Sequence, residues 1–140
     1  MPQACNRGVD TVVAGANGAV KDTFVEKGNA LCVGFARTLE AAPKLRNNDI
    51  VTYVNQNAAL MDKLVVDLRA LPVPPGDEAT VADMLATTTN LIGSLRQMGP
   101  AAAAGDLKRI KAIEKEVDAM EPAVNEKFGA YGLKVCGSPE

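Results

Sequence analysis

Apolar residues recur at every third or fourth position along four stretches of the chain, which is the spacing of amphipathic helices. The first stretch begins near Thr23 and ends before Pro43. Its apolar stripe contains Phe24, Leu31, Cys32, Phe35 and Leu39. Thr23 and Glu26 have the spacing of a capping box, so we predict that this helix starts near Thr23.

The second stretch follows Asn47 and Asn48, either of which can cap a helix, and it ends at Leu71. Its apolar stripe contains Ile50, Val54, Met61, Leu64, Val65 and Leu68. The segment from Pro72 to Gly76 cannot continue this helix, because proline lacks an amide donor and biases the preceding residue toward extended geometry. We therefore predict a stiff connector there.

Asp77 is predicted to cap the third helix, which Gly99 and Pro100 interrupt. The third apolar stripe contains Val81, Met84, Leu85, Leu91, Ile92 and Leu95. The following alanines can resume the helix for one turn until Gly105, which suits a left-handed helix end. Asp106 can then cap the fourth helix at once, so a tight reversal is predicted.

The fourth helix has the most regular spacing of apolar residues. Its stripe contains Leu107, Ile110, Ile113, Val117, Met120, Val124, Phe128 and Tyr131. Pro122 lies inside this pattern and is predicted to kink the helix without ending it, because the stripe continues beyond it. Gly132 marks the predicted end.

Four helices joined by short connectors favour an all-α fold, an up-down-up-down four-helix bundle. We assign this bundle to residues 22–140. Residues 1–21 contain three glycines and an Asn17-Gly18 turn signal, so we expect a flexible N-terminal arm or linker there.

Three cysteines, no CxxC pair and no histidine favour one disulfide and one odd thiol over a zinc site. In an up-down-up-down bundle the end of the fourth helix lies beside the start of the first. The tail can then fold back to the first helix, so we predict a Cys32–Cys136 disulfide. Cys5 is interpreted as a free or dimerising thiol, or alternatively as a lipid-anchoring residue. The alternative for all three cysteines is burial as inert thiols.

A disulfide indicates a protein that matures outside the cytoplasm. We therefore expect an extracytoplasmic protein, secreted or anchored to the envelope, whose export signal is not present in this chain. No run of about 18 apolar residues occurs, so no membrane span is predicted. The net charge is −2 with both signs interspersed, which argues against a nucleic-acid partner.

The absence of histidine removes the usual general base and the usual metal ligand. The acidic residues of the fourth helix interleave with lysines and lie off the apolar stripe, so they are interpreted as a solvated face. They are Glu114, Glu116, Asp118 and Glu121, and Asp62, Asp67 and Asp83 are interpreted in the same way. No enzyme activity, cofactor or metal is therefore predicted.

Four methionines offer a second hypothesis, since flexible thioethers can line an adaptable apolar pocket between helices. They are Met61, Met84, Met98 and Met120. Filling of the core is the preferred interpretation. A carrier or sensor of a small lipophilic ligand in an interhelical cavity stays as the alternative.

The arrangement of several short motifs resembles a group of small exported or lipid-anchored actinobacterial proteins. These motifs are the helix around Cys32, Leu68 to Pro72, the turn from Ala103 to Asp106, and the closing Gly-Leu-x-x-Cys-Gly from Gly132 to Gly137. The resemblance implies an envelope location, a helical bundle and a paired cysteine, but no activity. We expect a non-enzymatic helical module of the envelope or the secreted fraction, with either a protein–protein interaction role or an accessory role.

Overall fold

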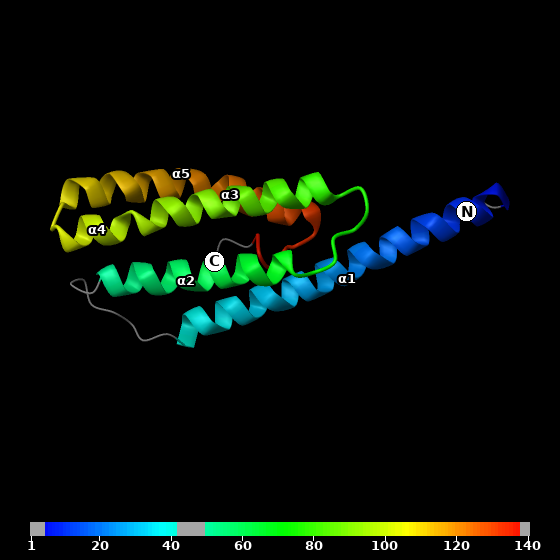
Figure 1. The fold of residues 1–140 in the computed structure, drawn as a ribbon, viewed down its shortest axis with the longest axis horizontal. Coiled ribbons are helices and arrows are strands. Elements are labelled where there is room, and N and C mark those ends of the chain that lie inside the picture. Colours follow the sequence, from blue (N-terminus) through cyan, green and yellow to red (C-terminus); the bar gives the residue numbers. More distant parts are fainter. Residues whose placement is uncertain (1–4, 42–49, 138–140) are drawn as a thin grey trace.

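The computed structural model describes residues 5–41 and 50–137, with side chains described from residue 18 onward. Within these residues the fold is all-α. The helices are α1 (Cys5–Ala41), α2 (Ile50–Arg69), α3 (Glu78–Arg96), α4 (Met98–Ala103) and α5 (Leu107–Tyr131). Helix α4 continues the course of α3 (Figure 1), so the two form one arm of the bundle.

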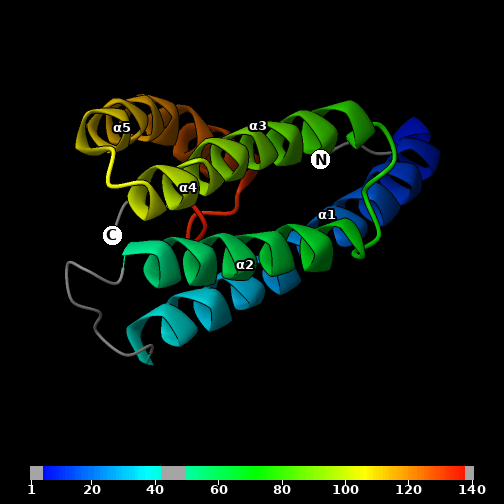
Figure 2. The same cartoon turned by 60° about the vertical axis from the view of Figure 1, so that its left-hand side comes forward.

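The helical arms run in alternating directions. Figures 1 and 2 show α1 beside α2 on one side of the molecule, and α3 with α4 beside α5 on the other. Helices α3 and α4 each pack against both α2 and α5, whereas α1 packs against α2. The predicted up-down-up-down four-helix bundle is therefore confirmed.

The core contains most of the apolar residues that the spacing predicts for helices α2, α3 and α5, but Leu107, at the first position of α5, is 68% exposed and does not join it. Val54, Leu68 and Ile113 are fully buried, and Met84 is only 1% exposed. Each of these residues belongs to the apolar stripe of its own helix. Burial of those faces supplies the main driving force for folding.

The N-terminal boundary of the first helix was predicted wrongly. Helix α1 begins at Cys5 rather than near Thr23, and it runs without a break through the predicted boundary between residues 21 and 22. No proline lies between Cys5 and Ala41, so no residue in this stretch lacks the backbone amide that a continuous helix needs. Thr23 and Glu26 therefore lie inside a helix, where a capping box has no terminal amides to satisfy.

Apart from the start of α1, the helix ends differ from the prediction at the end of α2, at the cap of α3 and at the break after α3. That break falls at Gln97, so that Gly99 and Pro100 lie inside α4 rather than interrupting the helix. The Asp106 carboxylate caps α5 by accepting a hydrogen bond from the Arg109 amide at 3.0 Å. Gly105 and Gly132 have the left-handed φ values of 70° and 108° that only glycine adopts readily. Helix α2 ends at Arg69, two residues before the predicted Leu71. Asp77 precedes α3, but its side chain makes no capping hydrogen bond.

Helix α5 continues through Pro122 to Tyr131, as the apolar spacing predicts. The proposed caps Asn47 and Asn48 lie outside the described residues.

Candidate functional site

The C-terminal tail is bonded covalently to the middle of α1. Cys32 and Cys136 form a disulfide with their Cα atoms 5.2 Å apart, which confirms the predicted pair. Cys32 is only 3% exposed. The backbone of Cys5 belongs to α1, and its side chain lies outside the described residues, so the interpretations of this thiol stay predictions.

Asn29 holds the same tail by two hydrogen bonds. Its Oδ1 accepts from the Val135 amide at 3.0 Å, and its Nδ2 donates to the Gly132 carbonyl at 3.4 Å. Leu133 is fully buried against Gly28, where a Cβ atom would lie 2.6 Å from the Leu133 Cδ2 atom. Any side chain at position 28 would therefore have to displace the Leu133 side chain. No spacing rule in the sequence points to Asn29.

Tyr131 connects three helices at the end of α5. Its hydroxyl donates a hydrogen bond of 2.6 Å to the Asp77 carboxylate, and its ring meets Phe24 edge-on at 5.7 Å between centroids. The Lys21 ammonium lies 4.6 Å from the centre of the Tyr131 ring. Burial, followed by the hydrogen bond to Asp77 and the negative charge of that carboxylate, raises the pKa of Tyr131 above its ordinary range.

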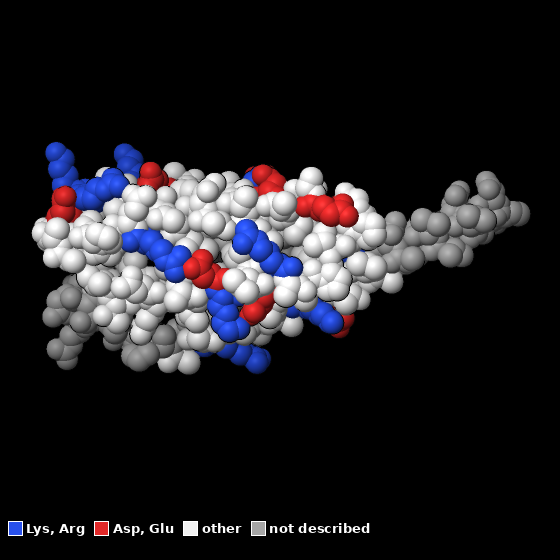
Figure 3. Space-filling model, in the orientation of Figure 1, with Lys and Arg blue, Asp and Glu red and all other residues white. Residues whose placement is uncertain are grey.

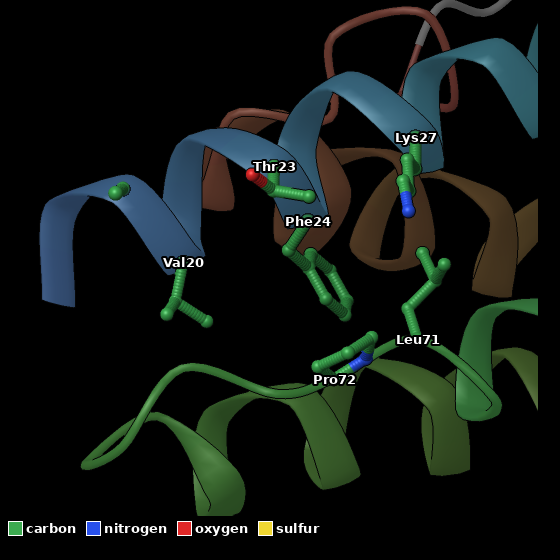
Figure 4. Close-up of a pocket in the computed structure, with 7 residues that line it drawn as sticks. Val20, Thr23, Phe24, Lys27, Leu71 and Pro72 are labelled. Carbon is green, nitrogen blue, oxygen red and sulfur yellow. The ribbon is translucent and has the colours of Figure 1, made fainter. Parts of the chain in front are cut away.

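A shallow apolar groove of about 240 Å³ lies beside this cluster, between α1 and the connector that follows α2. It is lined by Ala19, Val20, Thr23, Phe24, Lys27, Leu71 and Pro72. Figure 4 shows Phe24 of α1 pointing toward Pro72 of the connector, with Lys27 and Leu71 beside them. The sequence did not predict this groove, because it depends on the distance between α1 and a connector far along the chain.

The acidic residues considered as candidate metal or catalytic groups lie on the surface. Glu114, Glu116, Asp118 and Glu121 are all exposed, as predicted. Asp62, Asp67 and Asp83 form ion pairs with Arg96, Lys63 and Lys127. Figure 3 shows both signs of charge interspersed over one face of the molecule. No cluster of potential metal ligands occurs among the described residues.

The four methionines lie in the core or against it. Met84 and Met98 are buried in the core, Met61 and Met120 pack against it, and the groove contains none of the four. This arrangement favours the core-filling interpretation. Within the described helices, none is long and apolar enough to cross a membrane.

No protein-family model matches the chain, and no curated protein or solved structure matches it either.

Proposed function

We propose that the protein is a non-enzymatic module that acts outside the cytoplasm, in the envelope or in the secreted fraction. The disulfide supports this location, because such bonds persist in oxidising compartments. The resemblance to exported actinobacterial proteins points the same way. Intact-mass measurement after alkylation without reduction should show one modified cysteine in protein from its native source. Modification of all three cysteines would contradict the proposal.

We infer further that the module binds another polypeptide chain at the groove between α1 and the connector. The apolar groove walls carry this proposal, since Phe24 and Leu71 leave a hollow that is open to solvent yet lined almost entirely by carbon. Small-molecule sites usually enclose roughly 300 to 1,000 Å³ and bury most of the ligand. An open groove of about 240 Å³ suits protruding side chains of a partner better.

Site-specific photo-cross-linking tests this binding surface. A photoreactive residue replaces Thr23 in the groove, and the matched control carries it at Thr38, an exposed threonine of the same helix. Native envelope and secreted fractions should give a polypeptide adduct from Thr23 that is missing from Thr38. No adduct from Thr23, or equal adducts from both positions, would overturn the groove as the binding surface.

The carrier hypothesis makes a different prediction. A lipophilic ligand between the helices should remain bound in native mass spectrometry and should protect the methionines from oxidation. Detection of such a ligand in the purified protein would replace the protein-binding proposal.

A further inference from the structure

The turn between α4 and α5 contains the most exposed large apolar side chain among the described residues. Leu107, the first residue of α5, is 68% exposed, ahead of Val66 at 61%. Ala103 and Ala104, which precede it, are exposed as well. Figure 1 shows this turn at one end of the molecule, opposite the connector between α2 and α3. An uncovered apolar side chain thus lies at one end of the bundle.

Basic side chains follow this leucine. Lys108, Arg109 and Lys111 are all exposed. Asp106 is the only acidic residue in the segment from residue 103 to residue 111, which we call the basic turn, so three positive charges stand against one negative charge. Figure 3 shows Lys and Arg side chains gathered at this end of α5.

The rest of α5 has the opposite charge. Residues 114–127 contain five acidic and two basic residues, and the whole chain has a net charge of −2. A surface with a high density of negative charge would therefore attract the basic turn and repel the body of α5. Such a surface would meet the bundle end-on.

Folding alone does not account for the residues of the basic turn. The first turn of α5 contains no acidic residue, although the helix dipole favours acidic side chains there and disfavours lysine and arginine. Leu107 does not belong to the core. Lys108 and Lys111 form no ion pair among the described residues, whereas the Arg109 guanidinium donates a hydrogen bond of 2.6 Å to Gln97. This combination therefore suits a contact outside the chain.

We propose that the basic turn docks the protein on an anionic lipid surface. Such a surface presents negative phosphates above an apolar layer, so Leu107 can enter the layer while Lys108 and Lys111 reach the phosphates. The hydrocarbon stem of a lysine can lie along the boundary with its ammonium group in the polar region. A nucleic-acid backbone fits less well, because it offers the charge without the apolar layer.

This docking surface is separate from the groove. Helix α5 contains 25 residues and is about 37 Å long, and the connector that lines the groove lies at the opposite end of the bundle (Figure 1). End-on docking holds the groove away from the lipid, where a protein partner can reach it. The proposal thus goes beyond the binding of a polypeptide and does not depend on it.

Vesicle flotation of the full chain, prepared without lipid modification, tests the docking. Vesicles of phosphatidylglycerol and phosphatidylcholine in equal parts should bind the protein, and phosphatidylcholine alone should not. Lys108→Gln should lower the partition coefficient about fivefold, the effect of one lysine at an anionic surface. Lys134→Gln, in the tail, is the matched control, because it changes the net charge equally at another exposed lysine. It should bind like the wild type.

Binding to neither vesicle, equal binding to both, or equal effects of the two lysine variants would overturn the docking surface.

Tryptophan fluorescence tests the insertion of the leucine, since the chain contains no tryptophan. The emission of Leu107→Trp should shift to shorter wavelength with the anionic vesicles, and lipids brominated on their acyl chains should quench it. Val66→Trp is the control at an exposed apolar position of α2 near the connector, and its emission should stay unchanged. Equal shifts at both positions, or vesicle binding of Leu107→Trp without a shift, would contradict the insertion and overturn the proposal.

Discussion

Helices α5 and α1 are both long, but the bundle holds them in different ways. The apolar stripe of α5 is buried from Ile110 to Tyr131 except at Met120, which has intermediate exposure. On α1, Phe24 and Cys32 are buried, whereas Phe35 and Leu39 keep intermediate exposure. Helix α5 is therefore stabilised by continuous packing, and α1 by a few separate attachments.

Those attachments lie within three turns of α1. They are the disulfide, the hydrogen bonds of Asn29, the close contact of Gly28 with Leu133, and the cluster around Tyr131. Each joins α1 to the end of α5 or to the tail that follows it. The C-terminal segment thus compensates for the smaller apolar contact of α1.

Removal of the disulfide should have the largest effect on the stability of α1 relative to α5. The bond joins residues 104 positions apart, and the chain-entropy model assigns about 4 to 5 kcal/mol to a loop of this length. We expect a double Cys32→Ala, Cys136→Ala variant to lose most of that amount in denaturant unfolding. Amide exchange should accelerate more in α1 than in α5, and equal acceleration would contradict the comparison.

Two glycine substitutions on α1 should act in opposite directions. Gly28→Ala inserts a methyl group 2.6 Å from Leu133 Cδ2, and overpacking of this kind costs about 1 to 3 kcal/mol. Gly34→Ala meets nothing within 4 Å and should stabilise the helix by about 0.5 to 1 kcal/mol. Urea denaturation measures both. A stabilised Gly28→Ala variant would show that the tail does not constrain α1 there.

Local patterns predicted most of the fold, because helical spacing, proline, and glycine at helix ends each act within a few residues. The Cys32–Cys136 pair was also predictable, since the bundle topology brings the tail to α1. The capping-box spacing at Thr23 misled the prediction of the α1 start, because the same residues fit inside a continuous helix. The hydrogen bond between Tyr131 and Asp77 joins residues 54 positions apart, and no local sequence pattern predicts it.

Tyr131→Phe should lower the free energy of unfolding only slightly at neutral pH, and it should change how that free energy depends on pH. The variant keeps the ring contact with Phe24 but removes the hydrogen bond to Asp77, for which we expect a loss of about 1 kcal/mol at neutral pH, because water can reach the half-buried carboxylate.

The direction of the pH effect follows from the raised pKa of Tyr131 in the folded protein, which burial causes in the first place. The unfolded chain releases the phenol proton near pH 10, whereas the folded chain retains it. The stabilisation from this group is therefore complete below pH 10 and declines as the pH rises above that value. Unfolding free energies measured from pH 8 to 11 should fall more steeply for the wild type than for Tyr131→Phe. Parallel curves would show that the phenol does not titrate differently in the two states, and the Tyr131 cluster would then attach α1 by ring packing alone.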